Sequence, residues 1–149
     1  MNKQSAKLWA QTRVHVWPER YWLVSLPQAA LTNAVTAIAT SLARFAAIVL
    51  EQDEISLTVC EVVWQEFAEQ IEYNGAAGPY RVITFVLNVD LGTSGYLLPA
   101  AARLAEAGIA IVPQCAYLKD HLVIKEEDTA QAIEIIKGLI AECQHSVAR

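Results

Sequence analysis

The sequence has little charge and no long hydrophobic run, and each absence excludes a class of protein. Charged residues make up only 18% of the 149 residues, and the net charge is -5. Nucleic-acid binding takes its affinity from clustered Lys and Arg, and the sequence contains no such cluster. No stretch reaches the roughly 20 apolar residues that a membrane span needs. We therefore expect neither a nucleic-acid nor a membrane partner.

Cysteine and histidine are also scarce. The three cysteines are widely spaced and form no CxxC pair, so we expect reduced thiols rather than a disulfide framework or a zinc knuckle: Cys60, Cys115 and Cys143. The three histidines have neither the spacing nor the neighbours of metal ligands: His15, His121 and His145. We expect no metal, no other cofactor and, because residues 1–12 lead into no apolar run of signal-peptide length, a cytoplasmic location.

Apolar residues are abundant by contrast, at 54% of the chain. A chain of this length buries a sizeable core, and the remaining apolar surface is explained if the protein is a homo-oligomer. No catalytic triad, phosphate loop or pair of catalytic carboxylates is present, so we expect no enzymatic activity.

The first half shows alternating strand and helix patterns. Residues 14–26 read as a strand region interrupted by Pro18, and two β-rich runs follow at 46–50 and 55–60. Between the strand region and the first β-rich run, spacings of three and four place one set of apolar residues on a helical face that we expect to be buried: Leu31, Val35, Ile38, Leu42 and Phe45. A short helix over 62–71 and a linker over 74–79 complete this half.

The second half repeats the plan. Residues 80–89 form a long apolar strand, Thr93 or Ser94 is suited to cap the next helix, and Gly108 ends that helix. A hairpin over 109–125 precedes a last helix, whose apolar stripe contains Ala132, Ile133, Ile136, Leu139, Ile140 and Cys143. We expect a flexible tail over 1–12 and two halves, over 13–78 and 79–149.

This order of elements indicates an α+β fold, a two-layer sandwich with antiparallel sheet and helices on one face. The order of strand, glycine loop, helix, hairpin and helix resembles an ACT domain, which implies two tandem ferredoxin-like βαββα halves. The segments 104–111, LAEAGIAI, and 122–128, LVIKEED, resemble the small paired-ACT proteins related to the cytosolic arginine sensor of the TOR pathway.

The loop before the second-half helix is the first candidate for ligand binding. It contains Asp90, Leu91, Gly92, Thr93, Ser94 and Gly95. A helix N-terminus favours an anion such as an amino-acid carboxylate, and glycine lets the backbone approach a ligand. The alternative is that the two glycines only make a tight turn. In the family that the chain resembles, the ligand lies against this loop.

The hairpin supplies the second candidate, through Tyr117 and Asp120. The carboxylate of Asp120 is suited to the ammonium or basic side chain of a bound amino acid, whereas the alternative is a solvated turn beside Lys119. The resemblance implies that Asp120 contacts the ligand. The hairpin departs from the family pattern at Cys115, Ala116, Leu118 and Lys119.

We therefore expect a non-catalytic regulatory module that binds an amino acid or similar small ligand between its ACT-like halves. The alternative is a ligand-independent protein–protein interaction or oligomerisation module that has lost the amino-acid site. The departures in the hairpin favour this second hypothesis.

Overall fold

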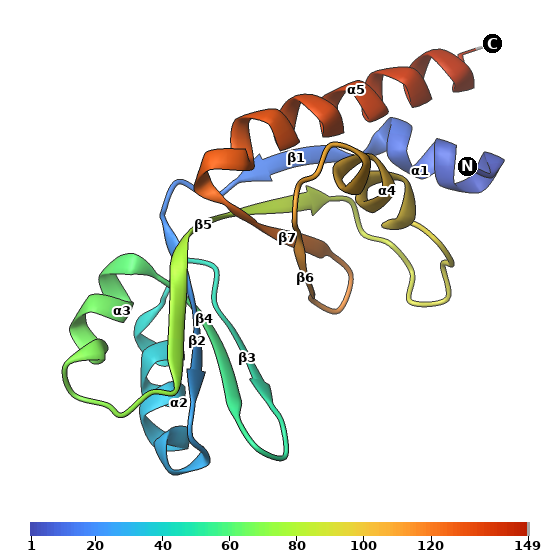
Figure 1. The fold of residues 1–149 in the computed structure, drawn as a ribbon. Helices are drawn as coiled ribbons and strands as arrows, with labels where there is room; N and C mark the ends of the chain where they lie inside the picture. Colours follow the sequence, from blue (N-terminus) through green and yellow to red (C-terminus); the bar gives the residue numbers. More distant parts are fainter. Residues whose placement is uncertain (149) are drawn as a thin grey trace. The chain divides into compact units, whose positions relative to one another are not determined.

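The computed structural model describes residues 1–148, and the chain divides into two compact units. Unit 1 combines Met1–Val16 with the chain from Ile83 onward, and unit 2 consists of Trp17–Val82. Both are mixed α+β structures with antiparallel strand pairing (Figure 1). No helix within residues 1–148 is both long enough and apolar enough to cross a membrane.

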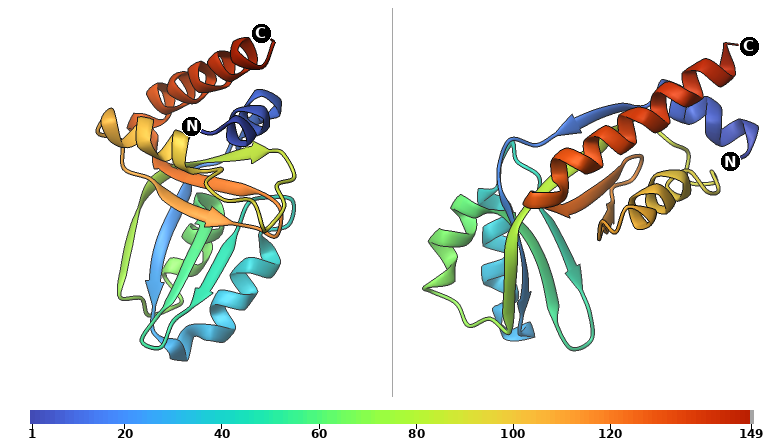
Figure 2. Two further views of the ribbon diagram at one scale, coloured as in Figure 1. Left: turned by 90° about the vertical axis from the view of Figure 1, so that its right-hand side faces the viewer. Right: turned by 45° about the horizontal axis from the view of Figure 1, so that its top comes forward.

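Unit 2 has the order strand, helix, hairpin, helix, strand. Its elements are β2 (Tyr21–Leu26), η1 (Gln28–Ala30), α2 (Leu31–Thr40), β3 (Ala47–Leu50), β4 (Ile55–Cys60), α3 (Glu61–Ala68) and the first part of β5 (Gly75–Val86). The strands lie in the order β3-β4-β2-β5. Helices α2 and α3 lie on the same face of these strands (Figures 1 and 2).

Unit 1 has the same arrangement but takes its strands from two parts of the chain. Its elements are α1 (Lys3–Gln11), β1 (Arg13–Val16), the last part of β5, α4 (Leu98–Glu106), β6 (Val112–Cys115), β7 (Asp120–Lys125), η2 (Glu126–Asp128) and α5 (Thr129–Val147). Its strand order is β1-β5-β7-β6, in which β1 pairs antiparallel with residues 83–86 of β5.

The two units thus exchange strands, and this changes the predicted boundaries. The N-terminal strand β1 completes unit 1, while residues 75–80 of β5 pair with β2 and complete unit 2. The division expected at 78/79 lies instead at 82/83. Residues 74–79, predicted to be a linker, lie mostly in β5, because Gly75, Ala76 and Ala77 pair with Ser25, Val24 and Leu23.

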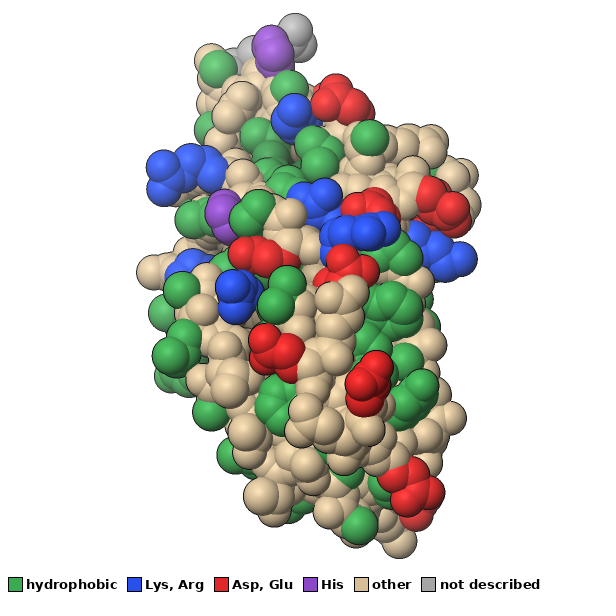
Figure 3. Space-filling view, turned by 90° about the vertical axis from the view of Figure 1, so that its left-hand side faces the viewer, with side chains coloured by type: hydrophobic (Ala, Val, Ile, Leu, Met, Phe, Trp, Pro, Cys, Tyr) green, Lys and Arg blue, Asp and Glu red, His purple; other side chains and the backbone are tan. Residues whose placement is uncertain are grey.

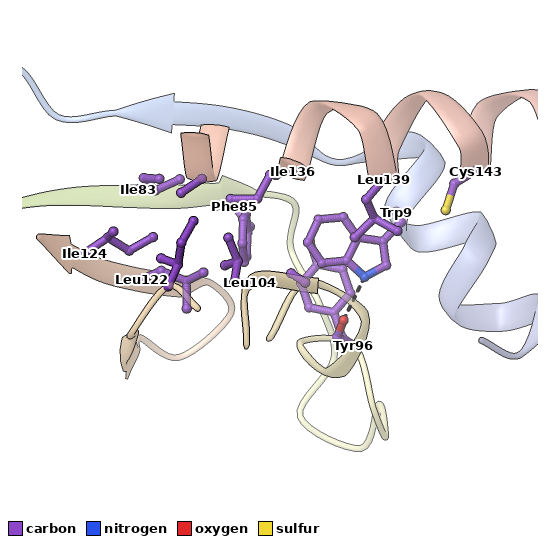
Figure 4. Packing of buried hydrophobic residues seen from close by; sticks show 13 residues of the cluster. Trp9, Ile83, Phe85, Tyr96, Leu104, Leu122, Ile124, Ile136, Leu139 and Cys143 are labelled. Atoms are coloured by element: carbon purple, nitrogen blue, oxygen red, sulfur yellow. Dashed lines mark hydrogen bonds between the residues drawn. The ribbon is translucent and has the colours of Figure 1, made fainter. Parts of the chain in front are cut away.

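The expected N-terminal tail is a helix that packs into unit 1. Asn2 caps α1 by accepting a hydrogen bond from the backbone N–H of Ser5 (2.7 Å). Trp9 on this helix is fully buried, and its indole N–H donates to the carbonyl oxygen of Tyr96 at 2.7 Å. Trp9 and Tyr96 stack with ring centroids 5.0 Å apart. Trp9 is therefore part of the unit 1 core, and Ala6, Leu8 and Ala10 pack against that core (Figure 4).

The apolar stripe predicted for the last helix is confirmed. Ala132, Ile136, Leu139 and Cys143 are fully buried, and Ile133 and Ile140 pack against the same core. Figure 4 shows Ile136, Leu139 and Cys143 pointing from α5 toward Trp9 and the strand residues. This core fixes the positions of Phe85 and Tyr96, which flank the loop between β5 and α4.

The face predicted to be buried on α2 differs from the prediction. Ala34 and Ala37 are buried, whereas Leu31, Val35 and Leu42 are 41%, 54% and 79% exposed. The small alanines allow α2 to lie close to the sheet, so the larger apolar side chains face outward. Only Phe45, beyond the end of the helix, is buried as expected.

Candidate functional site

A hollow of about 340 Å³ lies in unit 1, where the loop after β5 meets the β6–β7 hairpin. Its fourteen lining residues are Val89, Asp90, Leu91, Thr93, Gly95, Tyr96, Leu97, Leu98, Cys115, Ala116, Tyr117, Leu118, Lys119 and Asp120. All of them belong to unit 1. This volume is within the range of sites for small molecules.

Backbone hydrogen bonds hold the loop and the hairpin together. The N–H of Val89 donates to the carbonyl of Leu118 at 3.1 Å, which joins the two segments directly. Within the hairpin, the N–H of Ala116 donates to the carbonyl of Lys119 at 2.8 Å and closes a four-residue turn. The hollow is therefore built on hydrogen-bonded turns at the ends of strands.

Asp90 organises its own loop. Its carboxylate oxygen Oδ1 accepts from the N–H of Gly92 at 2.7 Å, and its carbonyl accepts from the N–H of Thr93 at 2.9 Å. This is the side-chain-to-backbone pattern by which Asp stabilises turns. For Gly92 the turn-forming alternative fits the geometry, since this glycine does not line the hollow.

Helix α4 starts later than predicted. Its first residue is Leu98, and neither Thr93 nor Ser94 caps it, because Leu97 is the N-cap and makes no side-chain bond. Pro99 lies in the first turn, where a missing N–H costs no helical bond. The N–H groups of Leu98 and Ala100 precede the first intrahelical bond, from Ala101 to Leu97 (3.1 Å), so they lie at the positive end of the helix dipole beside the hollow.

Helix α4 ends at Glu106, and Gly108 follows the C-cap residue Ala107 and closes the helix, as predicted. Gly108 has φ +74, and its N–H donates to Ala105 at 3.0 Å, while the N–H of Ile109 donates to Leu104 at 2.9 Å. These two bonds form a Schellman motif, and the burial of Ile109 supplies its hydrophobic contact.

Asp120 is the negatively charged group of the hairpin at this hollow. It is partly buried at the start of β7, directly opposite Cys115 in the strand register. A hydrogen bond from the Cys115 thiol to the Asp120 carboxylate raises the pKa of Cys115 to about 11, with further contributions from burial and the charge of Asp120. Cys115 is therefore a neutral donor at physiological pH and is not an activated nucleophile.

Tyr96 is one of eight lining residues that are not among the predicted site residues, and it is almost fully buried. Its side chain is only 3% exposed, and its hydroxyl forms a 2.7 Å hydrogen bond with the hydroxyl of Thr12. Burial raises the pKa of Tyr96 to about 12, an effect that the Thr12 hydrogen bond opposes and the charge of Asp120 reinforces. The signal in the sequence is an aromatic residue directly after a glycine, which is too common to indicate a site.

Six of the eight predicted site residues line one hollow: Asp90, Leu91, Thr93, Gly95, Tyr117 and Asp120. Gly92 and Ser94 do not line it. Gly95 has φ +75, a conformation that favours glycine, and an added Cβ there would meet nothing within 4 Å. Its requirement for glycine therefore comes from the backbone conformation, not from crowding.

The rim of the hollow is apolar and open to solvent. Leu91, Leu98 and Tyr117 are 69%, 67% and 76% exposed. Large apolar side chains at such exposure are typical of surfaces that are covered when a ligand or a partner binds.

The charged and metal-binding residue types of the described chain indicate which ligands the protein can hold. No group of three or more His, Cys, Asp or Glu side chains within residues 1–148 is arranged to hold a metal ion. On the face drawn in Figure 3, Lys and Arg side chains lie singly or beside acidic ones, without a continuous basic surface. His121, next to Asp120, is buried, and its Nδ1 is hydrogen-bonded to the Thr84 hydroxyl at 2.8 Å.

Unit 2 contains a corresponding loop and hairpin, but side-chain hydrogen bonds join them. The loop is shorter, and Gln28 at the start of η1 donates from Nε2 to the carbonyl oxygens of Glu51 (3.1 Å) and Gln52 in the β3–β4 hairpin. Ser25 also donates to the Glu54 carboxylate. Side chains of unit 2 thus join the two segments that, in unit 1, are joined by the backbone bond from Val89 to Leu118.

No family model matches the chain, and no curated protein matches it significantly. Solved structures are nevertheless similar over most of its length. A Vibrio cholerae protein of unknown function, described as a possible transport protein, is 18% identical with a TM-score of 0.70, covering 93% of this chain and 96% of its own. The regulatory subunit of aspartate kinase from Thermus thermophilus, in a ligand-free form, is 12% identical with a TM-score of 0.62, covering 86% of this chain and 97% of its own.

The Thermus flavus regulatory subunit of aspartate kinase is 10% identical with a TM-score of 0.61, and it covers 85% of this chain and 95% of its own. The chain has the ACT-like fold. At these identities the similarity establishes the fold alone, and the predicted α+β, antiparallel architecture is confirmed.

Proposed function

We propose that the protein is a regulatory ACT-type module that binds an amino acid, or a similar small ligand, in the hollow of unit 1. The observation that supports this function is the joint lining of one hollow by Asp120, by the Asp90–Gly95 loop and by the start of α4. An α-amino acid carries two opposite charges, and the hollow offers a complementary group for each.

The ammonium group binds Asp120. This carboxylate is partly buried, which strengthens a charge-assisted hydrogen bond relative to one in bulk water. The carboxylate of the ligand binds near Gly95 and Leu98, at the N-terminus of α4. Leu91, Leu98 and Tyr117 then cover the side chain of the ligand from the rim.

The proposed stoichiometry is one ligand per chain, bound within unit 1 rather than between the halves. All lining residues of the hollow belong to unit 1, and Gln28 bridges the equivalent segments of unit 2. A site that needs both halves is therefore not required.

Three further features belong to this proposal. The segments 104–111 and 122–128 support a relationship to the small paired-ACT proteins akin to the cytosolic arginine sensor of the TOR pathway. The similarity to aspartate kinase regulatory subunits supports a non-catalytic role. We also propose that the protein acts in the cytoplasm as a homo-oligomer.

Calorimetric titration with the twenty amino acids, preceded by a thermal-shift screen, tests this function. We expect one or two amino acids to bind with a stoichiometry near one. Asp120→Asn, which keeps the shape and removes the charge, should weaken binding about ten- to a hundredfold. The matched control is Asp53→Asn in the exposed β3–β4 hairpin of unit 2, which should bind like the wild type.

Equal binding by Asp120→Asn and the wild type would contradict the proposed site. A panel without any binding would favour the second candidate, a ligand-independent interaction or oligomerisation module. The observations that favour this candidate are the exposed rim of Leu91, Leu98 and Tyr117, and the departures from the family hairpin at Cys115 and Lys119.

A further inference from the structure

We infer that the outward face of α2 is the contact with a second copy of this chain, in an antiparallel helix pair about a two-fold axis. This surface, called the α2 face below, consists of the exposed residues Leu31, Thr32, Val35, Thr36, Ala39 and Thr40. The inference is independent of whether unit 1 binds a ligand.

The spacing of these residues makes one continuous stripe. They form two adjacent rows with a spacing of four residues, 31, 35 and 39 beside 32, 36 and 40, which places them together along one side of a helix. The opposite side of α2, with Ala34 and Ala37, packs on the sheet of unit 2. The α2 face is therefore an exposed helical surface that is apolar where solvent-facing helices usually carry charge.

The α2 face is uncharged, and the hydroxyl groups of Thr36 and Thr40 are hydrogen-bonded within the helix. No Asp, Glu, Lys or Arg occurs between Arg20 and Arg44. The Thr36 hydroxyl donates to the carbonyl of Thr32 at 2.9 Å, and the Thr40 hydroxyl donates to that of Ala37 at 3.0 Å. Covering this face removes apolar surface from water and buries no unpaired charge, as in the core of a protein interface.

The charges around the α2 face indicate which partner fits. Unit 2 contains eight acidic and three basic residues, which accounts for the whole net charge of -5. Two such acidic units repel one another unless they meet on an uncharged surface. A second copy meets this condition at the α2 face, because each partner presents the same neutral stripe.

The ends of α2 indicate the orientation of the pair. The acidic hairpin with Glu51, Asp53 and Glu54 lies beside the N-terminal end, since Gln28 bonds to it there. Arg44 follows the C-terminal end, where its backbone N–H donates to the carbonyl of Ser41 and its side-chain Nε lies 4.0 Å from the Glu19 carboxylate. In an antiparallel pair, Arg44 of each copy faces the acidic hairpin of the other copy. A parallel pair would bring like charges together, and two-fold symmetry makes the antiparallel contact self-complementary.

Val35 and Val62 provide a matched pair of variants. Both valines are 54% exposed, Val35 at the centre of the α2 face and Val62 on the neighbouring helix α3. In analytical ultracentrifugation over a concentration series we expect a wild-type dimer. Val35→Asp should raise the dissociation constant on the order of a hundredfold or more, because two unpaired carboxylates would be buried at the axis. Val62→Asp should remain dimeric.

Disulfide trapping keeps the inference testable if Val35→Asp fails to fold. Cys115 is the exposed native thiol, while Cys60 and Cys143 are buried, so the experiment uses a Cys115→Ser background. Under mild oxidation Val35→Cys should form a covalent dimer and Val62→Cys should not. A monomeric wild type, a dimer unaffected by a folded Val35→Asp, or equal crosslinking of both cysteine variants would overturn the inference.

Discussion

Unit 1 and unit 2 place a loop and a hairpin in corresponding positions, and in unit 1 a hollow of about 340 Å³ lies between them. In unit 1 the loop from residue 87 to residue 97 is long, and it meets the hairpin through one backbone bond, from Val89 to Leu118. In unit 2 the loop is short, and Gln28 reaches across to the hairpin carbonyls. The two units thus differ at these segments in loop length and in the glutamine side chain that bridges them in unit 2.

The two units also differ in what supports these segments. The site of unit 1 rests on Tyr96, which is held by Trp9 and Thr12 from the N-terminal segment of the chain. In unit 2, Asn74 donates to the backbone carbonyl and to the side chain of Ser25, and Ser25 donates to the Glu54 carboxylate of the hairpin. The loop of unit 1 is thus tied to residues 84 and 87 positions away in sequence, whereas the Asn74–Ser25 bond of unit 2 spans 49 positions.

Trp9→Ala should give the largest effect. The substitution removes a fully buried indole and its bond to Tyr96, at an expected cost of about 3–5 kcal/mol in the free energy of unfolding. Unit 1 contains no other tryptophan, so fluorescence of this variant reports unit 2 alone, while circular dichroism reports both units. We expect circular dichroism to detect a first urea transition that fluorescence does not.

Trp64→Ala is the control in unit 2, because Trp64 is also buried and contacts Tyr73 edge-on. It should destabilise unit 2 while the ligand still binds. If Trp9→Ala left both stability and ligand binding unchanged, the N-terminal helix would not support the hollow.

Gly95→Ala should have a smaller but site-specific effect. The left-handed conformation at φ +75 costs an alanine about 1–2 kcal/mol, although the added methyl group meets no atom. Gly75→Ala, at the start of β5, is the comparison, since its Cβ also meets nothing and its backbone has no positive φ. Urea denaturation should detect a loss only for Gly95→Ala. Equal stability of the two variants would show that the loop relaxes around the new side chain.

Local patterns predicted most of the elements, and non-local pairing accounts for the main differences. The last helix, the two hairpins and the αL glycine after α4 follow from spacings of a few residues. The assignment of β1 to unit 1 does not, because the register Arg13↔Val86 joins strands that are far apart in sequence. Strand patterns alone do not identify which distant strand is the partner.

The buried face of α2 shows a second limit. Both sides of this helix are apolar, and the larger side chains were predicted to be buried. The structure buries the alanines, since close packing on a sheet depends on shape as well as on hydrophobicity. Around the hollow, Asp90, Gly95 and Asp120 were predicted from the loop and the hairpin, and all three line it, whereas the predicted cap at Thr93 or Ser94 was wrong and placed Tyr96 within the helix.

The smallest expected difference between the units is the change in their stability when the pH is lowered. All three histidines lie in unit 1, and burial lowers the pKa of His121 below its usual 6.5. A buried neutral histidine stabilises the fold fully above pH 6.5. As the pH falls below 6.5 the unfolded chain takes up the proton more readily, so this contribution is lost toward the lowered folded pKa. Unit 1 should therefore lose stability between pH 7.5 and 5.5, while unit 2 changes little.

His121→Gln should flatten this dependence, whereas the exposed control His145→Gln should retain it, as measured by urea denaturation at each pH. An unchanged slope in His121→Gln would contradict this prediction, because groups other than His121 would then cause the pH dependence of unit 1.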